Sequence, residues 1–512
     1  MHISFLSAIT DYLRGDGAVI LPEVQLTLFG LGILLIDFTL GVKERYLNAG
    51  LALVGTLFSA YTVWKLRLPV AANGSLYGFH DSVVVDSFFL FFAGLFLAAT
   101  ALVILLSVKF LEIEQEQEGE YYALLLFACV GMMFMASGSD LIVMFLGLET
   151  MALSFYVLTG FLRRDKRSNE ASLKYVLLGA FSSGILAYGF SLLYGLSAST
   201  NIDNISEMLG RRNAFVNSIL HNPQPTTAQF DPFLLQLLPV MAFVFVAVGL
   251  FFKIAAVPFH QWAPDVYEGA PTPVTAYVSV ASKTASFALL LRLFLVVFGA
   301  THVNWMYLVA GIAVASLTWG NLAALTQTNV KRLLAYSSIS HVGYVLLGLV
   351  AGNKTAMTGI GFYLLAYIFM TAGAFAVLIV LRQKGLIGEE LEDLNGLYQR
   401  SPAAAVLLLI FMLSLAGIPP TAGFMGKYFI FLSLIETKHP VLAVFAVLYI
   451  VPALYYYFRI VVHAWLKQPG EAPRPVMSSA QAVALGVAVF VTLAAGLYPE
   501  PFTRLAQYAL GR

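Results

Sequence analysis

Long apolar stretches alternate with short polar connections along nearly the whole chain. A helix needs about 20 largely apolar residues to cross the hydrocarbon core of a bilayer. On this rule the sequence predicts an all-α polytopic membrane protein with about 14 transmembrane helices. The predicted helices lie near residues 20–40, 47–66, 84–108, 121–138, 140–161, 170–196, 236–258, 273–299, 305–326, 330–350, 355–381, 402–435, 440–466 and 478–498.

Two of these helices contain residues that interrupt a helix. The seventh, at 236–258, runs into VPFHQWAP, and the twelfth, at 402–435, contains AGIPPTAGF. Proline frees backbone polar groups, and at membrane depth such groups are tolerated only where protein or a wet cavity satisfies them. The two broken helices therefore point to a polar functional core.

The positions of the broken helices indicate an internal duplication. The seventh and twelfth helices are five apart, and because five is odd, repeats of five helices sit in the membrane with opposite topology. We therefore expect two inverted five-helix repeats. The expected parts are 1–120 with helices 1–3, 121–300 with the first repeat (helices 4–8), 301–466 with the second, inverted repeat (helices 9–13), and 467–512 with helix 14.

Basic residues in the predicted connections favour one orientation. Alternate connections carry 14 Lys and Arg on one side and 9 on the other, and the cluster RRDKR at 163–167 is the strongest. Because basic connections stay inside, both termini are expected on the outer side of the membrane. The connection at 69–83 contains Asn73-Gly74 between short apolar stretches, which favours a β-hairpin.

Composition excludes several other classes of protein. The chain is 59% hydrophobic and 11% charged, whereas soluble domains are about 25% charged. A net charge of +1 gives no electrostatic reason to expect nucleic acid as a partner. The single cysteine, Cys129, cannot supply the four ligands of an iron–sulfur cluster, and no zinc-type or phosphate-binding motif occurs. We expect no metal or cofactor site in this chain.

Charged residues nevertheless occur inside the predicted helices. They are Lys174, Lys253, Lys283, Arg292, Lys427 and Arg459, together with Glu149 in MFLGLETMALSF. A charge at the bilayer centre costs about 2.5–3.5 kcal/mol on insertion scales, so several of them together indicate a function. Arg292 and Arg459 lie nearer helix ends, where we expect a long side chain to reach the membrane surface.

The remaining charges suit proton transfer. Burial favours neutral lysine and a nearby carboxylate favours charged lysine, so moving a carboxylate switches a lysine between proton acceptor and donor. Arginine cannot do this because it stays protonated. The predicted relay consists of Glu149, Lys174, Lys253, His260, Lys283, His341 and Lys427. Each histidine has the alternative of a hydrogen-bonded core imidazole, and Lys174 is either a structural partner of Glu149 or the entry point of the proton.

Four long motifs surround these charges. They are GLETMALSFYVL (147–158), FFKIAAVPFHQWAPDVYEGAPTPVTAYVSVASK (251–283), NVKRLLAYSSISHVGYVLLG (329–348) and AGIPPTAGFMGKYFIF (416–431). They resemble the antiporter-like membrane subunits of respiratory complex I, and the resemblance covers about 84–466. It looks closest to the N-type subunits of NADH-quinone oxidoreductase. An M-type subunit is expected to have glutamate where Lys427 stands, and an L-type subunit carries a long C-terminal lateral helix.

The resemblance implies a proton-translocating subunit with inverted five-helix repeats. Carried over by motif, the polar positions of the family fall on Glu149 in the fifth helix, Lys253 in the broken seventh, Lys283 in the eighth and Lys427 in the broken twelfth, with Lys174 and His260 also at polar positions. It further implies that flavin, iron–sulfur clusters and NADH are bound by other subunits, and that quinone is reduced elsewhere in the complex. The expected partners are other membrane subunits of complex I, including neighbouring antiporter-like subunits, in a cell inner membrane.

Two other hypotheses remain open at this point. A subunit of a multisubunit cation/proton antiporter of the same superfamily needs the same lysine and glutamate machinery. A membrane scaffold needs only internal charge pairs, although unpaired lysines at mid-membrane are a costly way to join helices.

Overall fold

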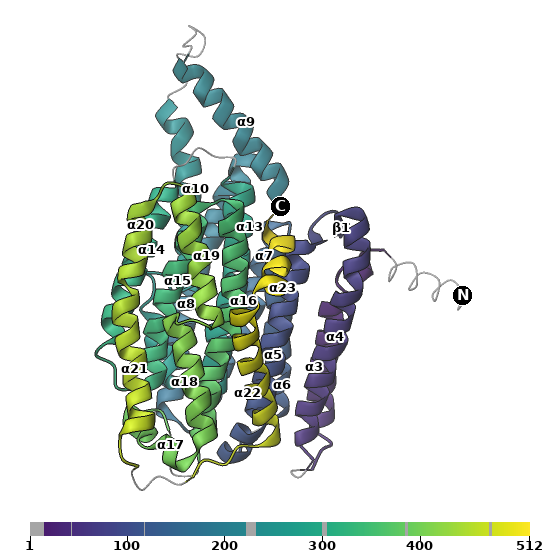
Figure 1. The fold of residues 1–512 in the computed structure, drawn as a ribbon. Helices are drawn as coiled ribbons and strands as arrows, with labels where there is room; N and C mark the ends of the chain where they lie inside the picture. Colours follow the sequence, from purple (N-terminus) through teal and green to yellow (C-terminus); the bar gives the residue numbers. More distant parts are fainter. Residues whose placement is uncertain are drawn as a thin grey trace, which may run out of the picture.

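The computed structural model describes most of the chain, and its helices form one bundle (Figure 1). The described residues are 15–41, 44–116, 118–221, 232–299, 305–383, 388–469 and 474–511. The predicted placement of the two chain termini therefore falls outside the described residues.

The N-terminal part forms three long helices and a small hairpin. Its elements are α2 (Asp16–Val19), α3 (Leu21–Asp37), α4 (Tyr46–Asn73), β1 (Ser75–Gly78), β2 (Val83–Asp86) and α5 (Ser87–Glu114). The hairpin is antiparallel and pairs Ser75 with Asp86. The predicted hairpin exists, but Asn73-Gly74 is not its turn: Gly74, at φ +81°, ends α4, and the residues with positive φ between the strands are 79–81.

The first predicted repeat contains the first broken helix. Its elements are α6 (Gly119–Ser137), α7 (Leu141–Thr159), α8 (Lys166–Ser197), α9 (Ile202–His221), α10 (Pro232–Lys253), α11 (Trp262–Gly269), α12 (Thr272–Tyr277), the π-helix η2 (Val278–Ser282), α13 (Lys283–Arg292) and the π-helix η3 (Leu293–Val297). Figure 1 shows α9 projecting beyond the end of the bundle.

The second predicted repeat contains the second broken helix, which is divided into α18 and α19. Its elements and those that follow are α14 (Trp305–Ala324), α15 (Val330–Ala351), α16 (Lys354–Leu381), the 3-10 helix η4 (Leu391–Leu394), α17 (Leu397–Arg400), α18 (Pro402–Ala416), α19 (Ala422–Glu436), α20 (Pro440–Leu448), α21 (Ile450–Leu466), α22 (Ser479–Leu497) and α23 (Glu500–Leu510).

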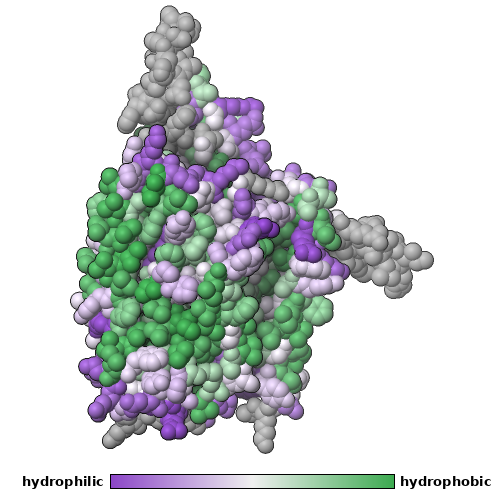
Figure 2. Space-filling model, in the orientation of Figure 1, coloured by the Kyte–Doolittle hydropathy of each residue, from purple (hydrophilic) through white to green (hydrophobic). Residues whose placement is uncertain are grey.

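Burial places α16 in the interior of the bundle. The most apolar window of this helix is entirely buried within the chain, whereas that of the pair α20–α21 is 28% buried. On the face seen in Figure 2, a broad hydrophobic belt lies between two hydrophilic ends. This distribution is the one expected of a bundle that is surrounded by lipid.

The prediction of a helical polytopic membrane protein is confirmed, but the number of transmembrane helices is not. Among the described residues, 11 helices are long and apolar enough to cross a membrane. The helix α3 has only 17 residues, and both α10 and α18 stop at breaks. The division into two inverted repeats stays a prediction.

Candidate functional site

The first helix break separates α10 from α11. Ala255 adopts a left-handed conformation at φ +58°, and the Val257–Pro258 peptide bond is cis. The backbone N–H of Val257 donates to Ser316 Oγ at 3.0 Å, and the indole N–H of Trp262 donates to the Phe252 carbonyl at 2.9 Å. Protein groups thus satisfy part of the freed backbone, as membrane depth requires.

Lys253 and Glu149 lie together at this break. Lys253 is the last residue of α10 and is 5% exposed. Glu149, on α7, lies within electrostatic reach of it. The Oε1 atom of Glu149 is buried, and it has no hydrogen-bond partner within the described part of the chain. The structure therefore brings together the carboxylate and the lysine that the sequence analysis combined.

Lys174 and His260 have different surroundings from those of Lys253. Lys174 is 42% exposed and forms ion pairs of 2.8 Å with both Asp265 and Glu170. Its partners are therefore these two acids and not Glu149, which corrects the first alternative of the sequence analysis. The ring of half-buried His260 lies 6.0 Å from that of Trp319, and its Nδ1 has no hydrogen-bond partner among the described residues.

Lys283 begins α13 directly after the π-helical turn η2. Such turns within α-helices are frequent at functional sites. Lys283 is 2% exposed, its Nζ donates to Ser338 Oγ on α15, and it lies 5.5 Å from the centre of the Tyr267 ring. A cavity of about 10 Å³ separates Lys283 from His341, which is room for about one water molecule.

Two tyrosines hold both ring nitrogens of His341. The Nδ1 atom lies 2.5 Å from the hydroxyl of Tyr363, and Nε2 lies 3.1 Å from the hydroxyl of Tyr457. In a neutral imidazole one nitrogen donates and the other accepts, and a hydroxyl can do either. His341 is also within electrostatic reach of Lys283 and of Lys427. Both ring nitrogens of His341 thus have a hydroxyl partner, and both lysines are near the ring.

Lys427 lies at the second break. It is 2% exposed, and its Nζ donates to the carbonyls of Leu415 at 3.1 Å and Ala416 at 2.9 Å, the last two residues of α18. A helix C-terminus has unpaired carbonyls and a partial negative charge, both of which attract a cation. Gly417 follows at φ +85°, and the peptide bond between the two prolines of the break, 419 and 420, is cis.

The buried groups form two sets. We call Lys283, His341 and Lys427 the central relay, and Lys253 with Glu149 the break pair. Tyr175 lies between the two sets, because its hydroxyl is beside Ser282, the neighbour of Lys283, and it interacts electrostatically with Glu149. Phenolic and aliphatic hydroxyls can both donate and accept a hydrogen bond.

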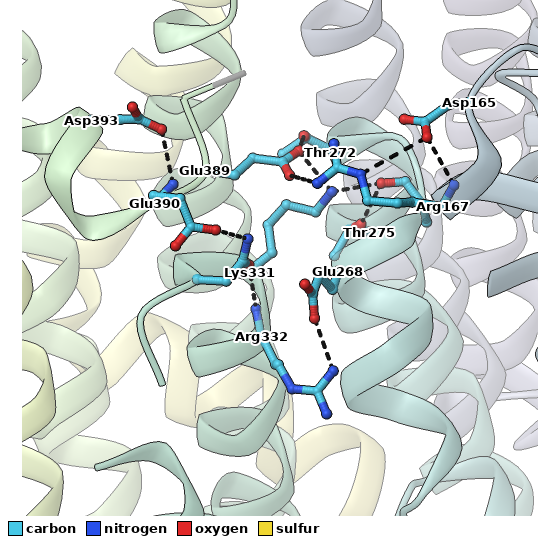
Figure 3. A network of polar contacts seen from close by, with 12 residues as sticks. Asp165, Arg167, Glu268, Thr272, Thr275, Lys331, Arg332, Glu389, Glu390 and Asp393 are labelled. Carbon is cyan, nitrogen blue, oxygen red and sulfur yellow. Dashed lines mark hydrogen bonds and ion pairs between the residues drawn. The ribbon is translucent and has the colours of Figure 1, made fainter. Parts of the chain in front are cut away.

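Sequence reasoning missed an ionic network at one end of the bundle (Figure 3). Lys331, one of the 14 basic residues that the sequence analysis assigned to connections on the inner side, is only 1% exposed. Its Nζ lies 2.9 Å from Glu389 Oε1 and donates to the Ala270 carbonyl at 2.7 Å. The acidic segment GEELED at 388–393 was the available signal, because a buried lysine needs a carboxylate partner.

Asp265 and Glu268 extend this network along α11. Asp265 pairs at 2.8 Å with both Lys174 and Arg332, and Glu268 pairs with Arg332 at 2.8 Å. These side chains line a cavity of about 220 Å³. Ion pairs thus connect α11, the second half of the broken helix, with α8 and α15.

Arg292 and Arg459 both bind partners near helix ends. Arg292 is 8% exposed, pairs with Asp86 at 2.9 Å and donates from Nε to the Ala136 carbonyl at 2.6 Å. Arg459 donates to the carbonyls of Leu325 and Gln327. Backbone carbonyls and the partly exposed carboxylate of Asp86, all near helix ends, satisfy these two residues. That their side chains reach the membrane surface stays a prediction.

Metal ligation finds no support in the described part of the chain, where no group of three or more His, Cys, Asp or Glu residues could hold an ion. A helical membrane bundle with two broken helices and buried lysines at both breaks defines a class of ion-conducting membrane subunit. Residues 138–451 match the family model described as NADH:quinone oxidoreductase/Mrp antiporter, TM. The chain therefore belongs to this family, and the resemblance seen in its motifs is confirmed.

Relatives are similar over nearly the whole chain. The protein named NADH-quinone oxidoreductase subunit N 2 of Solibacter usitatus is 50% identical over 506 residues, which is 98% of this chain and 99% of that protein. NADH-quinone oxidoreductase subunit N 1 of Koribacter versatilis is 51% identical over 508 residues, covering 97% and 96% of the two chains.

Solved structures agree with the fold. A chain of respiratory complex I from Thermus thermophilus with bound aureothin is 31% identical, has a TM-score of 0.75, and is matched over 94% of this chain and 98% of that one. A chain of the Mrp complex from Dietzia is 22% identical with a TM-score of 0.79, over 95% and 96% of the two chains. The second likeness shows the fold alone.

Proposed function

We propose that this chain is the N-type, proton-translocating membrane subunit of an NADH:quinone oxidoreductase, and that it couples NADH:quinone electron transfer to proton pumping. The observation that carries the proposal is the central relay: two buried lysines with a doubly hydrogen-bonded histidine near both, each lysine on an element next to a helix irregularity. Buried ionisable groups are costly in a membrane, so a set of them indicates a function, and here we infer that protons use it.

The names of the relatives support this assignment. The relatives that match nearly all of the chain are named subunit N of NADH-quinone oxidoreductase. Flavin, iron–sulfur clusters and the quinone reaction then belong to other subunits. The partners of this chain are the other membrane subunits of the complex, including neighbouring antiporter-like subunits, and the lipid bilayer.

The chemistry of each buried residue suits a different step of the proposed proton transfer. Glu149 sets the charge beside Lys253, so that a change in the carboxylate makes the lysine release or take up a proton. Tyr175 and the neighbouring serine connect the break pair to Lys283. His341 passes a proton by gaining it on one nitrogen and losing it from the other, and Lys427 receives it at the second break.

Lys174 and His260 lie at the edges of this path. Lys174 lines the cavity of about 220 Å³ together with Asp265, where a proton can be exchanged with water. His260 follows the first break, and its free Nδ1 is available to a water molecule or a proton. We assign Lys174 to proton entry and His260 to proton exchange at the first break.

The membrane orientation is also a proposal. The end of the bundle with the RRDKR cluster, Lys331 and Arg382, which we call the basic face, lies inside, and both termini lie on the periplasmic side of the cell inner membrane. Protons then enter from the basic face and leave at the opposite face.

A subunit of a multisubunit cation/proton antiporter is the second candidate, and the Mrp complex with its similar fold is the observation that favours it. The two are separated by gentle detergent extraction and native separation. Migration in a large NADH-oxidising assembly supports the first candidate, whereas migration in a smaller assembly without that activity supports the second.

The direct test replaces the break pair. Lys253→Ala and Glu149→Ala are expected to assemble normally and to lower the protons moved per NADH oxidised in proteoliposomes. Full pumping by either assembled variant would exclude the proposed role of that residue.

A further inference from the structure

A small cavity at the basic face is lined by a carboxylate that the central relay does not include. The cavity has a volume of about 10 Å³, room for about one water molecule. Among its lining residues are Asp165, Arg167, Thr272, Lys331, Arg382 and Glu389. Figure 3 shows Glu389, Lys331, Arg167 and Thr272 converging there from separate segments of the chain.

Glu389 is incompletely satisfied although it is 6% exposed. Its Oε1 atom lies 2.9 Å from Lys331 Nζ and accepts a hydrogen bond from Thr272 Oγ1 at 3.2 Å. Its Oε2 atom is buried and has no hydrogen-bond partner in the described part of the chain, and Arg167 Nη1 lies 4.0 Å away from it. A buried carboxylate oxygen without a donor is costly, so this atom is a place for a proton or a water molecule.

Lys331, the ion-pair partner of Glu389, lies on the same face of α15 as Ser338. Lys331 and Ser338 are seven residues apart, which is two helical turns, so they lie about 10 Å apart on one face. Ser338 is the residue that accepts the hydrogen bond from Lys283. The helix α15 therefore connects the cavity to the relay.

Tyr267 lies near Lys283 and, along the chain, near the backbone contact of Lys331. It lies on α11 three residues before Ala270, whose carbonyl accepts from Lys331. Its ring faces Lys283 at 5.5 Å, and its hydroxyl lies beside Ser338. That hydroxyl is buried and forms no hydrogen bond of good geometry among the described residues. It is thus free to exchange partners, as a proton carrier must.

We propose that Glu389 and Lys331 form a proton-loading pair, which takes protons from the basic face and passes them to Lys283 by way of Tyr267 and Ser338. In this step Glu389 Oε2 binds the incoming proton. A proton leaves Lys331, which Glu389 no longer holds in its charged form, and the Tyr267 hydroxyl carries it to Lys283. The inference rests on the proposed function, because it assigns an entrance to the same relay.

The test distinguishes a role of Glu389 and Lys331 in proton transfer from a role in stabilising the fold. Glu389→Gln leaves Lys331 buried and unpaired, which by itself harms the fold. The double variant Lys331→Gln/Glu389→Gln keeps polar side chains at both positions and removes both titratable groups. The matched control is Glu390→Gln, the same change on the neighbouring exposed residue, whose side chain accepts from Asn329 at 2.9 Å.

The assembled NADH-oxidising complex is reconstituted in lipid vesicles, and protons moved per NADH oxidised are measured with a pH-sensitive dye. We expect Glu389→Gln and the double variant to pump fewer protons per NADH than the unchanged protein but more than Lys283→Ala, because the entrance proposed at Lys174 stays open, while Glu390→Gln pumps like the unchanged protein. If Glu389→Gln fails but the double variant pumps fully, the pair only holds the fold, and the inference is overturned.

Lys283→Ala separates this inference from the proposed function. If Lys283→Ala pumps fully, the proposed relay is wrong and its entrance with it. If Lys283→Ala loses pumping and the double variant does not, only the entrance is wrong. Should the double variant fail to assemble, Tyr267→Phe decides, since it removes a single hydroxyl: lost pumping supports the path, and full pumping overturns it.

Discussion

The ammonium group of Lys427 lies 2.9 Å from the carbonyl oxygen of Ala416, across the break between α18 and α19. The ammonium group therefore donates to carbonyls at the end of α18, which would accept from the next helical turn if the proline break did not end the helix. The partial negative charge of a helix C-terminus favours a cation at this position. One residue thus satisfies the broken helix, and under the proposed function the same residue would also exchange a proton.

Replacing Lys427 by arginine separates these two roles. Lys427→Arg keeps a cation and hydrogen-bond donors for the α18 carbonyls but does not release a proton at physiological pH. We expect the complex to assemble and the rate of proton transfer through this subunit to fall on the order of tenfold or more, as in Lys427→Ala. The measurement is pumping per NADH oxidised in proteoliposomes. Unchanged pumping by assembled Lys427→Arg would mean that a permanent cation is sufficient.

Gly417 is required by the geometry of the same break. Its φ of +85° is strained for other residues, and an added Cβ would lie 2.9 Å from Lys427 Cδ. Gly417→Ala is expected to cost about 1–3 kcal/mol in stability. Gly486→Ala on α22, where nothing lies within 4 Å of the added Cβ, is the matched control and is expected to be neutral or slightly stabilising. The temperature at which the native assembly is lost measures both, and equal values for the two variants would contradict the argument.

The two tyrosines at His341 are expected to act together. Tyr363→Phe and Tyr457→Phe each leave one ring nitrogen without its partner, at a cost of about 1–3 kcal/mol. If the histidine passes protons from one nitrogen to the other, either variant interrupts the path, and the double variant pumps no worse than the more impaired single one. The measurement is a double-mutant cycle on the pumping rate. Two small, additive losses would indicate that the tyrosines only position the ring.

The principal site residues could be predicted from the sequence because a charge inside a membrane is conspicuous. Lys253, Lys283 and Lys427 interrupt apolar segments, and two of them adjoin prolines. The structure brings Glu149 near Lys253 and His341 near the other two lysines. Whether each of these residues carries protons stays a prediction until the variants above are measured.

The partners of the charges could not be predicted, because they come from distant parts of the chain. Lys174 pairs with Asp265, 91 residues away, and Lys331 with Glu389, 58 residues away. Periodicity and composition describe neighbours along the chain and carry no information on which helix ends meet in space. For the same reason Lys331 was counted with a polar connection, although packing at the basic face buries it.

Arg292 provides a test of a charge that is structural and not part of the relay. It pairs with Asp86, 206 residues earlier, whose carboxylate also accepts from the backbone N–H of Phe89 and so caps α5. Arg292→Ala removes a donor from this partly exposed carboxylate and from the Ala136 carbonyl, so we expect a loss of about 1–3 kcal/mol in stability and less assembled complex.

A surface ion pair is the matched control for Arg292. Arg211→Ala removes an arginine that pairs with Glu207 at 2.5 Å on the exposed helix α9, where such a pair contributes at most about 1 kcal/mol. We therefore expect Arg292→Ala alone to reduce the amount of complex in native separation, and pumping per assembled complex to stay unchanged in both variants. Reduced pumping by fully assembled Arg292→Ala would instead place this arginine in the proton path, since stability alone does not alter the protons moved per NADH.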